Sequence, residues 1–316
     1  MDMLSEEQRI EYVRIAHYYY KTGLTQEEIA ERMQLSRQKV NRILKRCVEL
    51  GIVQIQITGT EDTNLERELY LEETFGLRFA RVIPCAETQS MTKRLGAEAA
   101  KLLSELLQDD DTIGFSRGRT ISMVASELTS PRKKNLRVTQ LMGSWNSDQE
   151  EFAVDDIVHR AAQNIRGSTT MLYAPVVVRD PALRDSLMGE PYFQSAYQVV
   201  RSCSIAVLGI GRISPSHSGD IPTMTSEEYD QYLRENAVGE ICAHFFDKDG
   251  HEVLTEFDKR TIVILKDDLR SIPLRIGVAG GKSKQSAILA ALQSGLINAL
   301  VTDEHTARFL HHPTHL

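Results

Sequence analysis

Two glycine-rich segments of this 316-residue chain carry side chains suited to holding an anion. In the first, IGFSRGRTI at 113–121, the candidate residues are Gly114, Ser116, Gly118, Arg119 and Thr120. In the second, IGVAGGKSKQSAI at 276–288, they are Gly280, Gly281 and Lys284. Each segment reads as a strand that turns into a helix, where glycine admits a ligand close to the amides of the helix start. We therefore predict a phosphate-binding turn in each segment.

Neither segment matches a nucleotide-binding motif. They depart from both G-x-x-x-x-G-K-[ST] and G-x-G-x-x-G, so a nucleoside triphosphate or a dinucleotide is not indicated. Taken alone, a glycine-rich turn is equally consistent with a tight connection, Arg117 and Arg119 with solvated side chains, and Lys284 with a surface lysine. Two donor-rich turns in one region favour a phosphorylated small ligand.

A third segment, GEICAHFFDKDG at 239–250, places a carboxylate at the start of an apolar strand. Glu240 can accept hydrogen bonds from sugar hydroxyls, or it can pair with a base at a strand edge. An enzyme would need a positioned acid or base at the strand ends, and the candidates there, Glu240 and Asp303, have no evident partner in the sequence. We therefore expect no catalytic residues.

The histidines and cysteines do not form a metal-binding pattern. The four cysteines lie far apart without CxxC or Cys/His spacing, which argues against a zinc site or a disulfide framework. The C-terminal histidines are interpreted as part of a flexible tail: His305, His311, His312 and His315. We expect no metal and no cofactor.

The region from residue 77 onward alternates short strands with helical stretches. Strands are predicted at 80–83, 112–115, 137–141, 169–173, 205–209, 239–246, 261–264, 276–279 and 299–302, and helices at 91–107, 120–128, 154–165, 191–201, 226–234 and 284–294. This alternation predicts an α/β domain with a mostly parallel sheet covered on both faces. Ligands bind such sheets beyond the carboxyl ends of the strands, where the glycine-rich turns begin.

Residues 24–51, LTQEEIAERMQLSRQKVNRILKRCVELG, predict two short helices joined by a turn at Gln34. Thr25 and Glu28 form a T-x-x-E capping box for the first helix, and Ser36 suits the N-cap of the second. One arc of the second helix is apolar, with Val40, Ile43, Leu44, Cys47, Val48 and Leu50. This order is typical of a helix-turn-helix, whose second helix enters the DNA major groove.

The other face of the second helix is basic. Five basic residues follow one another with no acid before Glu49: Arg37, Lys39, Arg42, Lys45 and Arg46. The first turns approach base edges and later turns approach phosphates. The predicted DNA contacts are Thr25, Gln26, Ser36, Arg37, Gln38, Lys39, Asn41, Arg42 and Lys45. The alternative is an amphipathic core helix with a solvated basic face.

The flanking segments complete the expected domain organisation. A supporting helix is predicted at 6–22, and the alternation VQIQIT at 53–58 predicts a strand that is either a wing beside DNA or a strand closing the domain. A linker helix is predicted at 63–75, capped by Thr63 or Asn64. We expect a helical, winged helix-turn-helix domain at 1–58, a linker helix at 59–76, and an effector-binding and oligomerisation domain at 77–316.

Charge is divided between these regions. Residues 1–58 hold 9 Lys and Arg against 8 Asp and Glu, and the remainder holds 28 against 36, which gives the chain its net charge of -7. Attraction to DNA phosphates is therefore local to the N-terminal region, as screening requires. The acidic N-terminus MDMLSEEQR and the absence of a long apolar run lead us to expect a cytoplasmic protein with no membrane partner.

With these residues in view, the chain resembles the SorC family of sugar-responsive bacterial transcription regulators over almost its whole length. The resemblance rests on GLTQEEIAERMQLSRQKVNRILKRCVELGIV, IGFSRGRTI, LYAP at 172–175, GIG at 209–211, AVGEICAHFFDKDG, and VAGGKSKQSAILAALQSGLINALVTDEHTA. It implies an N-terminal helix-turn-helix and an effector domain with the sheet topology of sugar-phosphate isomerases and deaminases, used for sensing rather than catalysis.

The resemblance also implies roles for individual residues. Gly118, Arg119 and Thr120 would meet the effector phosphate, Glu240 would face the sugar hydroxyls, and Lys284 would neutralise the phosphate. Arg119 stands where many relatives have Thr, a departure that either strengthens phosphate binding or alters which ligand fits.

One further candidate lies in the segment 141–156, where the residues that contact the ligand vary within the family. Trp145, the single tryptophan, is either placed over the ligand or is a packing residue.

The expected function is DNA binding modulated by a phosphorylated sugar or sugar alcohol, with a homodimer or homotetramer reading a palindromic operator. The competing hypothesis is a sugar-phosphate isomerase or deaminase fused to a DNA-binding domain, and a third is RNA binding. Turnover of a sugar phosphate, or competition by structured RNA, would favour these alternatives.

Overall fold

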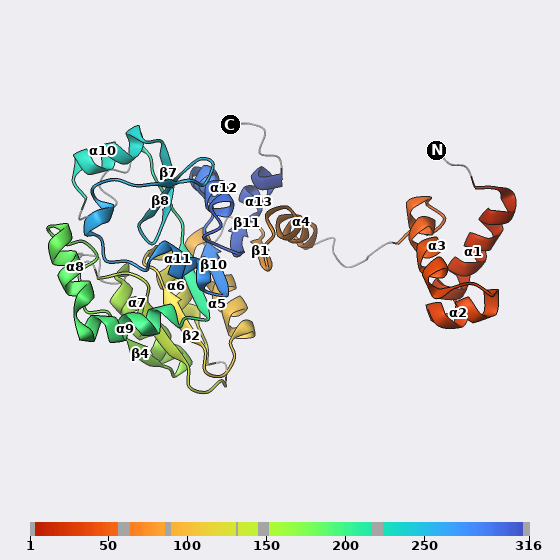
Figure 1. The fold of residues 1–316 in the computed structure, drawn as a ribbon, viewed down its shortest axis with the longest axis horizontal. Coiled ribbons are helices and arrows are strands. Elements are labelled where there is room, and N and C mark those ends of the chain that lie inside the picture. Colours follow the sequence, from red (N-terminus) through yellow and green to blue (C-terminus); the bar gives the residue numbers. More distant parts are fainter. Residues whose placement is uncertain are drawn as a thin grey trace. The chain divides into compact units, whose positions relative to one another are not determined.

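The computed structural model describes residues 4–55, 64–85, 90–130, 132–144, 152–215 and 224–311. The chain divides into two compact units, Met1–Asp62 and Thr63–Leu316. The helices of the first unit are α1 (Glu6–Tyr20), α2 (Gln26–Met33) and α3 (Arg37–Glu49), as labelled in Figure 1.

The helix-turn-helix forms through the local caps that its sequence predicts. The amide of Glu28 donates to Thr25 Oγ1 over 3.3 Å and the amide of Thr25 donates to Glu28 Oε2 over 2.8 Å, which completes the capping box of α2. Gln34 adopts a left-handed conformation with φ of 52° and ends α2. The amide of Lys39 then donates to Ser36 Oγ over 3.2 Å, which caps α3.

A small apolar core holds the first unit together. It contains Ile15, Ala16, Ile29, Ala30, Val40, Ile43, Leu44 and Cys47. Two residues predicted on the packing arc, Val48 and Leu50, are exposed instead, at 42% and 43%. Val48 follows buried Cys47 by a 100° turn of the helix and faces away from α1 and α2, whereas Leu50 lies beyond the helix end.

The predicted strand at 53–58 lies partly outside the described residues. Residues 53–55 are described and are not in a strand, and 56–58 are not described. The wing therefore stays a prediction.

Seven described strands of the second unit form one sheet in the order β1-β11-β10-β5-β2-β3-β4. Their bounds are β1 Phe79–Ile83, β2 Thr112–Phe115, β3 Arg137–Gln140, β4 Ser168–Thr170, β5 Ile205–Gly209, β10 Leu274–Val278 and β11 Ala299–Asp303. Every pairing in this sheet is parallel. The expected α/β fold class is confirmed.

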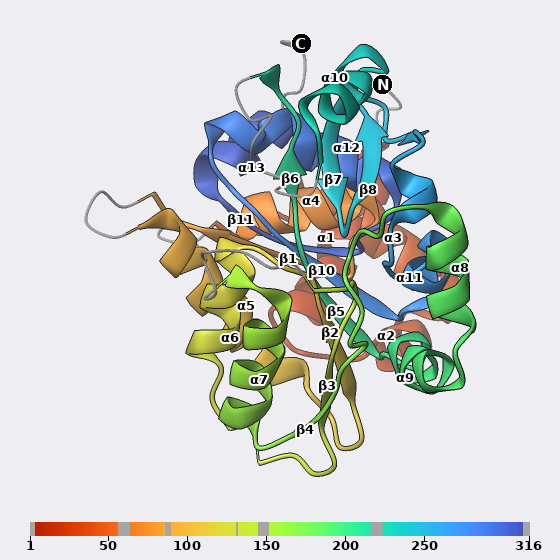
Figure 2. The same cartoon turned by 90° about the vertical axis from the view of Figure 1, so that its left-hand side faces the viewer.

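Helices cover both faces of the sheet, as Figure 2 shows. One face carries α5 (Met91–Leu106), α6 (Arg119–Glu127) and α7 (Val154–Ile165), and the other carries α4 (Leu65–Phe75), α9 (Pro191–Arg201), α11 (Lys266–Ser271), α12 (Gln285–Ser294) and α13 (Glu304–His311). The remaining helices are α8 (Pro181–Gly189) and α10 (Ser226–Arg234). Among the described residues, no helix is both long and apolar enough to span a membrane.

A second, antiparallel sheet corrects one prediction. The segment 239–246, expected as a single strand, is a hairpin in which β7 (Ala237–Ile241) turns at once into β8 (His244–Asp247). With β6 (Gly211–Arg212) and β9 (Glu252–Val253) these strands form the order β6-β7-β8-β9. Nothing in the sequence signals this turn, because the two turn residues, Cys242 and Ala243, are not usual turn residues such as glycine or asparagine.

Three further predictions differ from the structure. Residues 261–264 form only isolated bridges, Thr261 with Val177 and Val263 with Met142, rather than a strand. His305 and His311 lie in α13, which packs on the sheet through buried Ala307 and Leu310, and are not part of a flexible tail; 312–316 are not described.

The third concerns the cap of α4. Asn64 makes no cap hydrogen bond, because its amide donates to Val82 O over 3.1 Å instead, and Thr63 lies outside the described residues.

The antiparallel sheet contains a carboxylate whose ionisation is coupled to folding. The imidazole of His244, 3.8 Å from Glu252 Oε1, and the ammonium of Lys266, 2.7 Å from Glu252 Oε2, lower the pKa of Glu252 from 4.5 to about 2. A lowered native pKa means that the ionised group stabilises the fold above about pH 4.5, and that this contribution is lost as the pH falls towards 2.

Replacing Glu252 by Gln is therefore expected to lower the urea midpoint near pH 7. The difference from the unmodified protein should narrow as the pH falls from 4.5 to about 2, because the native carboxylate then also becomes neutral. Urea titrations across this pH range measure the effect. Glu256→Gln is the control, since Glu256 is exposed and its ion pair among the described residues is with exposed Lys259; an equal response of both variants would contradict the assignment.

Candidate functional site

A cavity of about 360 Å³ lies beyond the carboxyl ends of β2 and β5. From this pair the sheet continues through β3 on one side and through β10 on the other. The chain connections that follow β2 and β5 therefore lead to opposite sides of the sheet. Such a switch point is where open α/β sheets bind ligands. The lining residues are Ser116, Arg117, Arg119, Met142, Val176, Val177, Gly209, Gly211, Arg212, Ile213, Tyr229, Glu240, Cys242, Ala243, Phe245, Phe257, Ser283 and Lys284.

The turn after β2 lines one side of the cavity. Ser116 is buried, and its Oγ accepts a hydrogen bond of 2.9 Å from the amide of Gly209, which ties the end of β2 to the end of β5. Gly118 is the N-cap of α6 and has φ of 124°, a conformation that disfavours any side chain. Arg117 and Arg119 flank this glycine and both line the cavity. The turn therefore presents two guanidinium groups beside the start of a helix.

The turn after β10 brings a lysine to the same cavity. Lys284 Nζ donates to the carbonyl of Ile210 over 2.7 Å, so the side chain reaches from the end of β10 to the end of β5. Its amide donates to Gly281 O over 2.9 Å within the 3-10 turn Lys282–Lys284. Backbone and side chain together hold the ammonium group at the cavity.

The hairpin β7–β8 supplies the carboxylate. Cys242 and Ala243 form its turn with φ of 51° and 59°, a left-handed conformation that costs roughly 1–2 kcal/mol for each residue with a side chain. The turn directs the amide of Ala243 at Glu240 Oε2, 3.0 Å away. A Cβ on Gly211 would lie 2.2 Å from Glu240 Oε1, so glycine at this position leaves room for the carboxylate.

The environment of Glu240 shifts its ionisation in opposing directions. Burial raises the pKa of Glu240, whereas the hydrogen bond from Ala243 and the charges of Arg117 and Lys284 lower it, and burial prevails. Burial and the neighbouring carboxylate also raise the pKa of the Cys242 thiol, which therefore stays protonated near pH 7.

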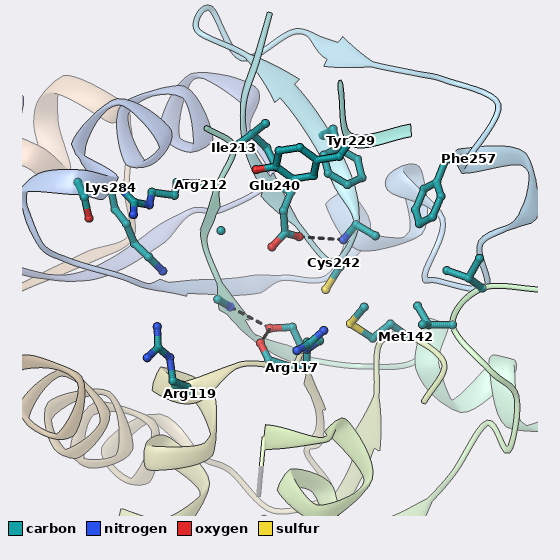
Figure 3. Close-up of a pocket in the computed structure, with 18 residues that line it drawn as sticks. Arg117, Arg119, Met142, Arg212, Ile213, Tyr229, Glu240, Cys242, Phe257 and Lys284 are labelled. Carbon is teal, nitrogen blue, oxygen red and sulfur yellow. Dashed lines mark hydrogen bonds between the residues drawn. The ribbon is translucent and has the colours of Figure 1, made fainter. Parts of the chain in front are cut away.

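The cavity has an excess of positive charge. Figure 3 shows Glu240 and Cys242 on one side, facing Arg117 and Arg119 on the other, with Lys284 reaching in between them. Among the described lining residues, four side chains are cationic and one is a carboxylate; the cationic residues are Arg117, Arg119, Arg212 and Lys284. A concave site of this charge concentrates anions.

The structure brings together four of the residues predicted for the effector, because Ser116, Arg119, Glu240 and Lys284 all line the cavity. The other described candidates, Gly114, Gly118, Thr120, Gly280 and Gly281, belong to the adjoining elements rather than to the lining. A Cβ on Gly114 would meet Leu141 at 2.3 Å, so this glycine serves packing inside the sheet. Trp145 lies outside the described residues.

Sequence reasoning missed several residues of the lining. Arg212 and Tyr229 come from β6 and α10, and no spacing in the sequence connects them with the glycine-rich turns. The motif GIG at 209–211 was the available signal for this region, because Gly209 and Gly211 both approach other groups of the site closely.

The predicted DNA contacts lie on α3 and its N-cap and at the start of α2. Ser36, Arg37, Gln38, Asn41, Arg42 and Lys45 are exposed, as is Thr25, and Gln26 is half-buried. Lys39 differs from its neighbours, since its ammonium group lies 3.6 Å from the carboxylate of Glu11 on α1.

Both units match known families. Residues 61–311 match the family described as "Putative sugar-binding domain", and residues 10–60 match the MarR family. The sorbitol operon regulator of Klebsiella pneumoniae is 30% identical over 304 residues, which cover 94% of this chain and 96% of that protein. The chain belongs to the SorC family of sugar-binding transcriptional regulators.

A second relative and a solved structure also match over almost the whole chain. The transcriptional regulator LsrR of Escherichia coli (strain K12) is 31% identical over 312 residues, covering 96% of this chain and 94% of LsrR. The crystal structure of full-length SorC from Klebsiella pneumoniae matches with a TM-score of 0.73 and 29% identity, over 97% of this chain and 99% of SorC. The relatives are named as transcriptional regulators, and this chain combines a helix-turn-helix with a sugar-binding domain.

Proposed function

We propose that the cavity binds a phosphorylated sugar or sugar alcohol, and that occupancy of the cavity modulates binding of the helix-turn-helix to operator DNA. The observation that carries this proposal is the arrangement of four cationic side chains around one carboxylate. A phosphate is held by Arg and Lys through charge-assisted hydrogen bonds. The carboxyl oxygens of Glu240 accept hydrogen bonds from sugar hydroxyls.

The two ends of such a ligand would occupy different parts of the cavity. We assign the phosphate to Arg119, Lys284 and the helix start at Gly118, with Thr120 in the first turn of that helix. We assign the sugar hydroxyls to Glu240. A cavity of about 360 Å³ lies in the range that accommodates small metabolites.

The output of this sensor would be the exposed face of α3. One helix-turn-helix reads only a half-site, so we propose that a homodimer or homotetramer binds a palindromic operator. The effector changes DNA binding only to the extent that it binds the two conformations with different affinity.

A thermal-shift screen tests the proposed ligand class. Phosphorylated hexoses, pentoses and hexitols are each compared with the same compound lacking the phosphate. A ligand present at 100 times its dissociation constant should add about 2.7 kcal/mol to the free energy of unfolding. We expect stabilisation only by phosphorylated compounds. Stabilisation by the neutral sugars alone would contradict the phosphate site, and turnover of any of these compounds would favour the isomerase or deaminase alternative.

A further inference from the structure

A single buried carboxylate joins the lysine turn of the cavity to the next helix along the chain. Asp303, at the end of β11, is 1% exposed. Its Oδ2 accepts a hydrogen bond of 2.7 Å from the amide of Gly281, in the turn that carries Lys284. Its Oδ1 accepts from the amides of His305 and Thr306 at 3.0 and 3.1 Å, which caps the start of α13.

Other contacts strengthen this link between the lysine turn and α13. Thr306 Oγ1 donates to Asp303 Oδ2 over 2.6 Å, so one oxygen serves both the cavity turn and α13. A Cβ on Gly280 would lie 2.5 Å from the same oxygen, so the backbone of the turn fits against the carboxylate with no room to spare. The side-chain amide of Gln285, just after the turn, donates to His305 O over 3.2 Å. A shift of the turn alone would therefore break the hydrogen bonds that Gly281 and Gln285 make.

The helix α13 in turn packs against α4, the helix that precedes β1. Tyr70 of α4 donates through its hydroxyl to His311 O over 3.3 Å, and the two rings lie 3.9 Å apart between centroids. Arg67 of α4 lies 3.7 Å from the carboxylate of Glu304 at the other end of α13. These contacts span the length of α13, so the two helices are held at both ends.

The helix α4 also closes the free edge of the sheet. Strand β1 is the outer strand beside β11, and its outward amides would lack a partner. Glu72 Oε1 accepts from the amide of Ala80 over 2.9 Å, and Glu68 Oε1 accepts from the amide of Val82 over 2.8 Å. These two carboxylates replace a neighbouring strand, so α4 is aligned with the sheet through directional bonds and not by apolar packing alone.

In the sequence, α4 is the first described element after the helix-turn-helix unit, and only 56–63 lie between them outside the described residues. The contacts thus form a continuous series from Lys284 through Gly281, Asp303 and α13 to α4. Because packed elements have few alternative arrangements, a displacement at one end of such a series is transmitted rather than absorbed.

We propose that Asp303 is a positioning residue that couples occupancy of the cavity to the order of α4. An anion at Lys284 draws the turn 281–284 towards the cavity, and the shared carboxylate transfers this restraint to α13 and from there to α4. This inference rests on the proposed function, because it requires an anion to bind beside Lys284.

Hydrogen exchange of the full-length chain, with inorganic phosphate as the probe and sodium chloride at equal ionic strength as the reference, tests this coupling. In the unmodified protein we expect phosphate to slow exchange in 281–288, and to slow it in 65–75 by about fivefold or more, the lower limit of typical coupling between sites. Slower exchange in both segments would demonstrate energetic coupling between them, which spatial proximity alone does not.

The variant Asp303→Asn is designed to remove the oxygen that accepts from Gly281 and from the hydroxyl of Thr306, while the other oxygen remains. Its Oδ1 still caps α13, as asparagine does in other helices, but an amide nitrogen now faces the Gly281 amide, donor against donor. Phosphate should still slow exchange in 281–288 while its effect on 65–75 disappears. Asp303→Ser, whose shorter side chain caps α13 without reaching Gly281, should behave alike and serves if the first variant does not fold.

Thr306→Val is the matched control. It removes one hydrogen bond from the same carboxylate and leaves the Gly281 contact intact, so phosphate should slow exchange in both segments as in the unmodified protein. Retention of the effect on 65–75 in Asp303→Asn, or slowing restricted to 281–288 in the unmodified protein, would overturn the coupling and leave the proposed function standing. If phosphate leaves 281–288 unchanged in the unmodified protein, the anion site itself is wrong and the coupling falls with it.

Discussion

Replacing Lys284 by alanine is expected to abolish the influence of the effector on DNA binding while DNA binding itself persists. The ammonium group lines the cavity and is held there by the carbonyl of Ile210, 2.7 Å away. A charge-assisted hydrogen bond to a phosphate contributes about 1.5–3 kcal/mol, so effector affinity should fall roughly 10- to 150-fold. Calorimetric titration with a phosphorylated sugar identified by the thermal-shift screen measures this loss, and operator binding with and without that sugar measures the response.

The same turn provides the control for this variant. Lys282 is exposed and does not line the cavity, so Lys282→Ala removes an equal charge without removing a proposed phosphate contact. We expect effector affinity close to that of the unmodified protein. Unchanged effector affinity in Lys284→Ala, or an equal loss in both variants, would show that the phosphate binds elsewhere.

The second large effect is expected at the start of α3. Arg37→Ala or Gln38→Ala should weaken operator binding by about 1–3 kcal/mol and relax the preference for particular bases. Both side chains are exposed in the first turn of α3, the part of a recognition helix that approaches base edges. Binding titrations against the operator and against single-base variants measure the change.

Two other positions on α3 separate base contacts from general attraction to DNA. Lys45 lies further along the helix, and Lys45→Ala should weaken specific and non-specific binding alike and reduce the salt slope by about 1. Lys39→Ala should have the smaller effect, since Lys39 pairs with Glu11 at 3.6 Å. An unaltered footprint in Arg37→Ala and Gln38→Ala would show that α3 does not read bases.

The helix-turn-helix could be predicted almost completely, because its determinants are local. Thr25, Glu28 and Ser36 cap the helices through residues three positions away in the chain. The exceptions were Val48, which lies about a 100° turn of the helix away from buried Cys47, and Leu50, which follows the last residue of α3.

The candidate site could be predicted only in part. The two turns could be recognised because glycine, arginine and lysine directly after a strand indicate an anion-binding turn. Ser116, Arg119 and Lys284 do line the cavity. Arg212 and Tyr229 lack such a signal, since they reach the cavity from the antiparallel sheet and from α10.

The sequence by itself determined the fold class, because hydrophobic periodicity and end signals act over a few residues and alternate regularly along the second unit. Only the tertiary structure decided which strand ends meet, since the sheet order places β5 between β2 and β10 and so joins turns separated by more than a hundred residues. It alone decided the roles of Asp303 and Glu68 as well. A carboxylate acquires such a role from the amides that point at it, and these amides belong to other elements that the fold places beside it.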